Sequence, residues 1–507
     1  MKQLKKRILQ ILIGLSVLYL LLLIPDSNNT AIAKATEKPF VWSKDAAWLQ
    51  LENNFKNAQL QPKEKIDSNI RILFSLEESL YNKIQLVNTS FADSNITVMS
   101  SNFFLLASLV AAHPSHRDSF VNLYNKIRSN VKLQSKQWDI NKKEVRNHLY
   151  QQLYGMRAAV EEVLLQTDSL LFDPAMLVKD ESSATPSTTI FGIKVHSGDL
   201  LVSRGGAEVS ALISRGNDYP GNFSHVALIY VDEKNRPYLI EAHIEKGVAI
   251  ASAEQYINDK KLRFMVLRPR ADLPQLKKDL LLPQKAARYA FDEVKKRHIP
   301  YDFKMNFVDS SAMFCSEVGS YAYKKNGIQL WQGVSTISSQ GVVNWLHAFG
   351  VENFVTQMPA DLEYDPQLSI VAEWRNPETL FKDHMDNAVM DVLLEAADKG
   401  RQINYSIWQL PLVRVVKGWC MLNNLFGKPA LIPEGMSATQ ALKNQYFITM
   451  CVKLSKSTKL LSEKFLKEKV LQATLLAAGK SCTKSKRGNK CRLVGNGLFF
   501  NIIHTDA

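Results

Sequence analysis

The spacing of apolar residues divides the chain into regions of different structure. Stretches such as KIDSNIRILFSLEESLYNKIQLV and EVRNHLYQQLYGMRAAVEEVLLQTDSLLF repeat apolar residues every three or four positions, and glycine is nearly absent around them. This is the period of amphipathic helices, so we expect a helical domain over residues 34–178. The polar segment DESSATPSTT that follows has the composition of a linker, which we place at 179–190.

From residue 191 the pattern changes to short apolar and β-branched runs bounded by Gly, Asn, Asp and Pro. The runs are GDLLVS, HVALIYV, PYLIEAHI, GVAIAS and FMVLRP, and helical segments follow at 284–296 and 315–325. This order predicts an α+β domain with a small antiparallel sheet over 191–376. Asn376-Pro377-Glu378 has the signature of a helix start, and a mostly helical, basic region is expected over 377–507.

The N-terminus has the layout of an export signal. A basic head, KQLKKR, precedes a mostly apolar run from Ile8 to Ile24, and Ala31-Ile32-Ala33 offers a small-residue cleavage site. The run is long for a cleaved signal and near the lower limit for a membrane span. We therefore expect residues 1–33 to be a signal peptide or an uncleaved anchor. The rest of the chain is then exported, either periplasmic or anchored in the inner membrane and facing the periplasm.

Composition excludes several classes of protein, and charge singles out the tail. With 46% apolar and 22% charged residues, the chain is neither disordered, nor collagen-like, nor a multi-span membrane protein. The net charge is +14, of which residues 401–507 carry +13. These residues could contact anionic lipid or an envelope polymer, or they could form a helix packed on the body with solvated lysines. Nucleic-acid binding is not expected, because the chain is exported and has no recognised nucleic-acid module.

The five cysteines are unevenly placed. Cys315 lies in the middle domain and the other four lie in the tail. In an oxidising compartment Cys482 could pair with Cys491 and Cys420 with Cys451, which would leave Cys315 free. Four cysteines allow three pairings, so the connectivity stays open.

Three residues of the middle domain form a candidate catalytic set. His225 begins one apolar strand, Glu241 lies in the next strand, and Cys315 begins a helix. A hairpin turn centred on Glu233 would place His225 and Glu241 directly opposite each other on one face. The helix dipole would lower the pKa of the Cys315 thiol. A thiol, a neighbouring imidazole and a carboxylate that orients the imidazole are the parts of a cysteine hydrolase.

The strings around these residues resemble a known family. GDLLVS, SHVALIY, EA followed by GV, PYDF, FCSEVGSYAY and finally MPADLEYDPQLSIV are similar to the permuted papain-like amidases, the YaeF/YiiX-like group of NlpC-related cysteine hydrolases. The resemblance covers about residues 191–376. It implies a permuted papain-like fold with Cys315 as nucleophile, His225 as base and Glu241 as third residue. It further implies a supporting role for Tyr301 near the oxyanion, and it leaves His243 as the alternative third residue.

The residues and the resemblance together predict an exported thiol hydrolase. It would cleave an amide, in cell-wall peptide or in an N-acyl amino compound, through an acyl-enzyme. Two alternatives stay open: an inactive envelope-binding or scaffold protein that uses the basic C-terminal region, and a lipid acyltransferase with the same cysteine. No cofactor and no metal are expected, because nucleotide-binding fingerprints and closely spaced metal ligands are missing from the sequence. Oligomeric state and substrate identity stay open.

Overall fold

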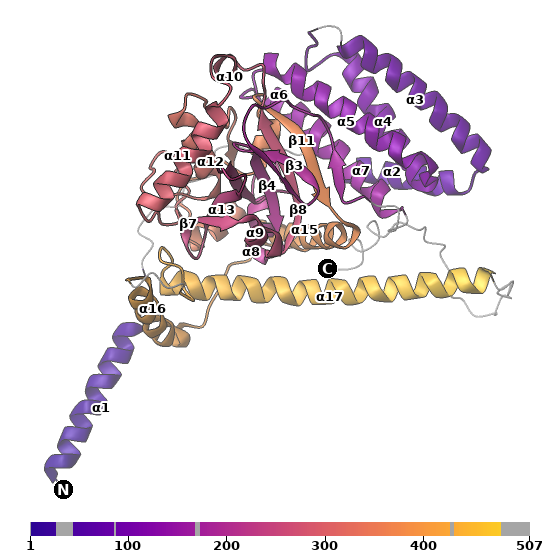
Figure 1. Ribbon diagram of the computed structural model, residues 1–507. Coiled ribbons are helices and arrows are strands. Elements are labelled where there is room, and N and C mark those ends of the chain that lie inside the picture. Colours follow the sequence, from indigo (N-terminus) through magenta and orange to yellow (C-terminus); the bar gives the residue numbers. More distant parts are fainter. Residues whose placement is uncertain (1, 27–43, 86–87, 168–172, 426–429, 478–507) are drawn as a thin grey trace, which may run out of the picture.

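The structure is a computed structural model that describes residues 2–26, 44–85, 88–167, 173–425 and 430–477. Figure 1 shows a layer of helices from the N-terminal third packed beside a central sheet, with further helices around the sheet. A long C-terminal helix, α17 (Ala438–Ala477), runs beneath this body, and the first helix, α1 (Lys2–Leu22), projects away from it.

The N-terminal third forms the helical layer that the apolar spacing predicts. Its helices are α2 (Lys44–Gln59), α3 (Lys63–Gln85), α4 (Ser94–Ala112), α5 (Arg117–Gln134), α6 (Lys143–Tyr150) and α7 (Met156–Leu165), with a π-helical turn at Gln151–Gly155 between the last two. They share one apolar core, which includes Phe103, Phe120 and Leu153. Helix α4 has the length and composition of a membrane span, but half of its apolar window is buried inside the protein, as expected of a core helix.

The middle third contains a seven-stranded sheet whose strand pairs are all antiparallel, in the order β1-β11-β8-β4-β5-β6-β7. The strands are β1 (Ala175–Leu177), β4 (Leu200–Gly205), β5 (His225–Val231), β6 (Pro237–His243), β7 (Gly247–Ser252), β8 (Lys261–Pro269) and β11 (Leu368–Arg375). Two small hairpins stand beside it: β2 (Ser187–Ile190) with β3 (Ile193–His196), and β9 (Ser335–Thr336) with β10 (Val355–Thr356). The predicted α+β fold with an antiparallel sheet is confirmed.

Side chains alternate between the two faces of the sheet, and each face has its own core. Leu200, Val202 and Leu228 point to one face and pack with α11 (Leu282–Lys296) and α12 (Cys315–Lys325). Leu201 and Ala227 point to the other face and pack beneath the β2–β3 hairpin. This is the two-residue period of strands buried on both sides. The shorter helices are α8 (Glu208–Arg215), α9 (Ala253–Asn258), α10 (Pro274–Lys278), α13 (Gln340–Ala348) and α14 (Asp361–Tyr364).

The segment expected to be a free linker is packed against the sheet. The Glu181 carboxylate accepts hydrogen bonds from the Ser369 hydroxyl (2.6 Å) and the Ala271 backbone N–H (2.9 Å), and Thr185 is buried. Composition indicated an exposed connection because Ser, Thr and Pro are common in linkers. The same hydroxyl and carboxylate groups instead satisfy polar groups at the edge of the sheet.

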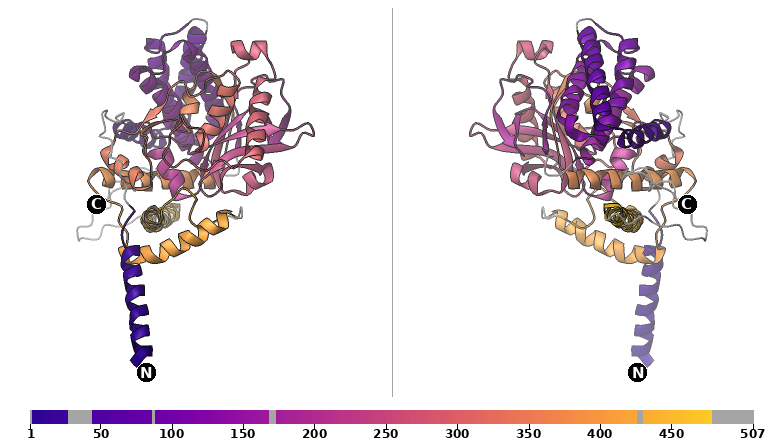
Figure 2. Two further views of the ribbon diagram at one scale, coloured as in Figure 1. Left: turned by 90° about the vertical axis from the view of Figure 1, so that its left-hand side faces the viewer. Right: turned by 90° about the vertical axis from the view of Figure 1, so that its right-hand side faces the viewer.

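The C-terminal region begins as predicted. Helix α15 (Pro377–Asp398) has Asn376 as its N-cap, whose side chain accepts a hydrogen bond from the Thr379 backbone N–H (2.8 Å), and proline at its first position. It is followed by a 3₁₀ turn (Ile407–Gln409), α16 (Leu410–Leu425) and α17. Figure 2 shows α16 running across the base of α1 while α17 is seen end-on beneath the body.

One of the two expected disulfides is not formed. Cys420 and Cys451 are free, buried thiols. They lie on different helices and in different apolar clusters, Cys420 with Ile432 and Met436, and Cys451 with Phe447 and Met450. Spacing in the sequence could not show that the two thiols are separated in this way. The other pairing, Cys482 with Cys491, lies outside the described residues.

Candidate active site

Cys315 is the first residue of α12, at the helix start that the sequence predicts. The helix lies close against the sheet because residue 319 is glycine: a Cβ there would be 2.7 Å from Cδ2 of Leu200. At the other end of the helix the Tyr323 hydroxyl donates a hydrogen bond to the Gly198 carbonyl. These contacts fix the N-terminus of α12, and with it the Cys315 thiol, beside the first residues of β5.

The thiol lies between main-chain groups on either side of His225. Its Sγ is 3.9 Å from the carbonyl oxygen of Ser224, and the Val226 N–H is directed at the sulfur. Cys315 is only 4% exposed. Burial raises the pKa of the Cys315 thiol to about 11 and outweighs the hydrogen bonds that favour the thiolate. The N–H groups at the start of α12 act in the expected direction and lower this pKa, but burial has the larger effect.

His225 and Glu241 are brought together, but in a different register from the expected one. The His225 Nε2 is 2.7 Å from a Glu241 carboxylate oxygen. In the β5–β6 pair Glu241 lies opposite Ala227, so Glu241 is the diagonal neighbour of His225 rather than its direct partner. The turn is centred one residue later than expected because Asn235 adopts a left-handed conformation, with φ of 57°. A turn centred one residue later shifts the pairing of the two strands by two residues, and a two-residue shift keeps both side chains on one face of the sheet.

His243 takes the position directly across from His225. The two ring centroids are 5.7 Å apart, and His243 Nε2 is 3.0 Å from the second carboxylate oxygen of Glu241. One carboxylate thus contacts two imidazoles, so His243 does not replace Glu241 as the partner of His225 but adds a second contact to it. The Glu241 side chain is buried, whereas those of His225 and His243 are 17% and 29% exposed. The site is therefore accessible from the side of the histidines.

The charges of the group follow from burial and these contacts. Burial alone would raise the pKa of Glu241, but hydrogen bonds with His225 and His243 hold it well below its usual range. Burial lowers the pKa of His225 despite the neighbouring carboxylate. At neutral pH the group therefore has an ionised carboxylate, a neutral His225 and a neutral thiol. Because Nε2 of His225 faces Glu241, Nδ1 is the ring nitrogen that can accept the proton of the thiol.

Two further residues contribute to the surroundings. Burial, and after it the charge of the Cys315 thiol, raises the pKa of Tyr301 well above its usual value. Lys261, on strand β8, which β4 separates from β5, is buried, and its ammonium lies 4.5 Å from the centre of the Tyr256 ring. Its positive charge adds to the lowering of the His225 pKa. The sequence analysis missed Lys261, because no local motif marks a lysine that only strand pairing brings to the site.

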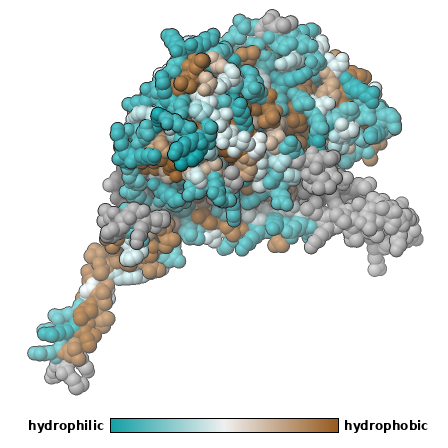
Figure 3. Space-filling view, in the orientation of Figure 1, coloured by the Kyte–Doolittle hydropathy of each residue, from teal (hydrophilic) through white to brown (hydrophobic). Residues whose placement is uncertain are grey.

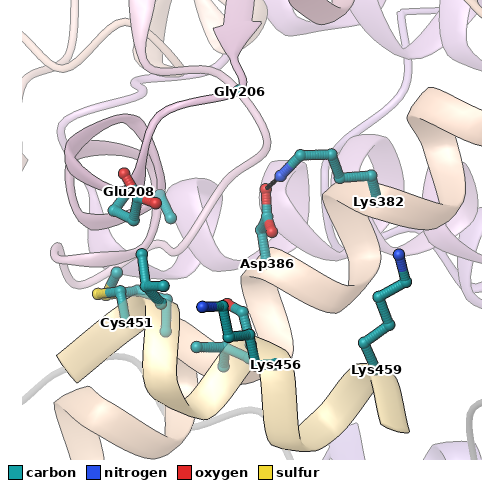
Figure 4. Close-up of a pocket in the computed structure, with 12 residues that line it drawn as sticks. Gly206, Glu208, Lys382, Asp386, Cys451, Lys456 and Lys459 are labelled. Carbon is teal, nitrogen blue, oxygen red and sulfur yellow. Dashed lines mark hydrogen bonds and ion pairs between the residues drawn. The ribbon is translucent and has the colours of Figure 1, made fainter. Parts of the chain in front are cut away.

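A separate cavity of about 200 Å³ lies between α8, α15 and α17. Figure 4 shows Glu208, Asp386, Cys451 and Lys456 around it. Cys451, predicted only as a disulfide partner, lines this cavity, whereas none of the predicted catalytic and supporting residues does. Among the residues that the structure describes, no group of three or more His, Cys, Asp or Glu side chains is arranged to hold a metal ion.

Comparison with known proteins concerns the same region. Residues 194–372 match the family model described as "Permuted papain-like amidase enzyme, YaeF/YiiX, C92 family". A search of the curated proteins found no match. Among solved structures, one titled crystal structure of metalloprotein YiiX from Escherichia coli O157:H7 matches at 20% identity. The match covers 35% of this chain and 97% of that one, with a TM-score of 0.29. By the family match, residues 194–372 form a permuted papain-like domain of the YaeF/YiiX family.

Proposed function

We propose that the protein is an exported thiol hydrolase that cleaves an amide bond, with Cys315 as nucleophile, His225 as base and Glu241 as the residue that orients His225. The observation that carries the proposal is the arrangement of the three groups. The thiol stands at a helix N-terminus against the backbone on both sides of His225, and the imidazole bonds to a buried, ionised carboxylate. All three residues lie within the matched segment.

The reaction begins from neutral groups. As a substrate carbonyl approaches, Nδ1 of His225 takes the thiol proton while Sγ forms a bond to the carbonyl carbon. The oxyanion is held by backbone N–H groups at the start of α12. When the C–N bond breaks, His225 gives its proton to the leaving amine. Water then loses a proton to His225 and attacks the thioester carbon. As the C–S bond breaks, His225 returns this proton to Sγ, which releases a carboxylic acid and restores the thiol.

Glu241 supports the charged state of His225 in each half of this cycle. The imidazolium that forms during thiol deprotonation is stabilised by a carboxylate 2.7 Å away. His243 holds the other oxygen of that carboxylate, and so keeps Glu241 from turning away from His225. We expect a substrate amide either in cell-wall peptide or in an N-acyl amino compound, as the sequence led us to expect.

Two measurements test the proposal, one of the reactivity of the Cys315 thiol and one of substrate hydrolysis. The full chain is treated with iodoacetamide, modification of each cysteine is followed by mass spectrometry, and hydrolysis is assayed on a panel of peptidoglycan peptides and N-acyl amino acids. Cys315 should be alkylated faster than the buried Cys451, and Cys315→Ala should abolish hydrolysis. Cys451→Ala, which removes a buried thiol outside the site, is the matched control and should retain activity.

One observation favours a second candidate, an inactive binding protein with the same fold. The thiol is almost fully buried and neutral at rest, which is also the state of a structural cysteine. Equal, slow alkylation of Cys315 and Cys451, together with no hydrolysis across the panel, would favour this candidate and contradict the hydrolase.

A further inference from the structure

The 3₁₀ turn and α16 carry an apolar stripe that the described part of the protein leaves uncovered. Five side chains at alternating spacings of four and three residues are between 52% and 68% exposed: Trp408, Leu412, Val415, Trp419 and Leu422. This spacing puts them on one face of the helix. Large exposed apolar stripes of this kind mark a surface that meets an apolar partner.

The opposite face of α16 holds the helix firmly to the body, so the direction of the stripe is fixed. Leu410 and Cys420 are buried, Leu410 in a small apolar cluster with the first turns of α17 and Cys420 in another with the segment that leads into α17. The Lys417 ammonium donates hydrogen bonds to the carbonyl oxygens of Pro433 (2.7 Å) and Glu434 (2.9 Å). The exposed stripe is therefore a second apolar face, not a misplaced core face.

The last turn of α1 is bonded to the same helix. The Arg414 guanidinium donates hydrogen bonds to the carbonyl oxygens of Leu22 (3.1 Å) and Ile24 (2.6 Å) and to the carboxylate of Asp26 (2.6 Å). Asp26 also accepts a hydrogen bond from the Thr439 hydroxyl at the start of α17 (2.9 Å). Arg414 thus satisfies the carbonyls at the end of α1 and joins this helix to both C-terminal helices.

Helix α1 itself is apolar and exposed along its length. Its leucines and isoleucines from Ile8 to Leu21 are exposed by about half or more, and Figure 3 shows this apolar helix as a brown column that projects from the body. A helix that is apolar all round, and that meets the rest of the described protein only near its last turn, is suited to lipid. The run Ile8–Ile24 is 17 residues and spans about 25 Å, somewhat less than the roughly 30 Å of a bilayer core.

We propose that α1 is retained as a membrane anchor and that the stripe on α16 is embedded in the outer surface of the same bilayer, as an interfacial helix. Figure 2 shows α16 crossing the base of α1, which is the level at which a spanning helix leaves the bilayer. Interfacial helices lie about 5–10 Å into the headgroup and acyl boundary. Because the end of α1 is bonded to α16, it would lie at the same depth, and the short apolar run then has less of the bilayer to cross. Two tryptophans at this level fit the aromatic belt of membrane proteins.

Charge favours a bilayer that contains anionic lipid. Helix α17 begins at the same junction, and its Lys453 and Lys464, which do not line the cavity beneath the body, are exposed. Each such lysine near an anionic surface contributes about 1 kcal/mol of attraction. The proposal does not depend on the proposed hydrolysis, because it concerns a surface that none of the catalytic residues forms.

Quenching of tryptophan fluorescence tests the proposal on the full chain. The protein is reconstituted into vesicles of phosphatidylethanolamine and phosphatidylglycerol in which part of the lipid has bromine atoms at a shallow acyl position. Trp408 and Trp419 should be quenched, so the double variant W408F/W419F should lose more than half of the quenching seen with the wild type. W345F, which removes a buried indole of the body, is the matched control and should leave the quenching unchanged.

Two results would overturn the proposal. One is quenching of W408F/W419F equal to that of the wild type, since the stripe would then lie outside the lipid. The other is a dimer of the wild type in detergent that L412E converts to a monomer while V308E, at an exposed valine of the body, does not. In that case a second copy of the chain, rather than lipid, covers the stripe.

Discussion

At the scale of single residues, the candidate site depends on one buried carboxylate with two imidazole neighbours. In Glu241→Gln the amide cannot stabilise a charged imidazole, and its contact with His225 loses the charge assistance of the present pair. We expect the kcat/KM for the cleaved amide to fall about 10²- to 10⁴-fold, the range for loss of acid–base assistance. His243→Gln, which removes only the second contact of the carboxylate, should cost about tenfold or less. An equal loss in both variants would contradict the assignment of Glu241 as the direct partner of His225.

The protonation states of Cys315 and His225 set the pH dependence. The thiol pKa is raised to about 11 and the His225 pKa is lowered, so the two groups do not form a thiolate–imidazolium pair at rest. Alkylation proceeds through the thiolate, and its second-order rate constant at Cys315 should therefore rise about tenfold per pH unit from pH 6 to 9. A rate constant that is flat over this range would show a preformed ion pair.

The same two groups predict the pH profile of hydrolysis. The active form has a neutral His225, which is lost when the pH falls through the His225 pKa, below the ordinary histidine value of about 6.5. The kcat/KM should accordingly be constant from pH 7 to 9 and decrease only in more acidic solution. A decrease that is complete by pH 7 would contradict a lowered His225 pKa.

At the scale of elements, the β5–β6 hairpin determines which residues meet. Its turn needs a residue with positive φ at Asn235. Asn235→Val should lower the free energy of unfolding by about 1–2 kcal/mol, because a β-branched residue disfavours the left-handed conformation. It should also reduce kcat/KM, since a shifted turn alters the register that joins His225 to Glu241. Asn235→Gly, which tolerates positive φ, is the matched control and should preserve activity; loss of activity in both variants would contradict this role of the turn.

The same hairpin shows what sequence can and cannot predict. The strands that carry His225 and Glu241 were predictable, because their apolar runs are bounded by turn residues, and so was the start of α12 at Cys315. The register was not, because it depends on whether Asn235 or a neighbour adopts positive φ. The raised pKa of Cys315 was not predictable for a related reason: the helix start can be read from the sequence, whereas burial of the thiol depends on β5 packing against it.

At the scale of the whole molecule, buried ion pairs join the N-terminal helices to the sheet and to α14, and the sheet to α15. Arg128 pairs with Glu373, Arg157 with Glu363, and Arg263 with both Glu161 and Asp383. Each pair joins residues far apart in the sequence, and no local pattern marks them. Composition alone led us to expect a linker between two domains, whereas these contacts make the helical layer and the sheet parts of one packed body.

Asp383 lies between two buried guanidinium groups, 3.2 Å from Arg204 and 2.6 Å from Arg263. Asp383→Leu would leave both arginines without this carboxylate in the interior, so the free energy of unfolding should fall by about 3–5 kcal/mol. Asp386→Leu is the matched control, one turn later on α15. It breaks only a partly exposed pair with Lys382 and should cost at most about 1 kcal/mol.

Chemical denaturation of the full chain measures this difference, and the form of the transition adds a second readout. If the ion pairs join the layers into one cooperative unit, fluorescence of Trp138 in the helical layer and of Trp331 beside the sheet should report a single midpoint, shifted equally in Asp383→Leu. Single-tryptophan variants that retain one of these two residues make the comparison. Two results would mean that apolar packing rather than charge holds the helices on the sheet. One is separate midpoints for the two tryptophans, and the other is a free energy of unfolding for Asp383→Leu that is no lower than that for Asp386→Leu.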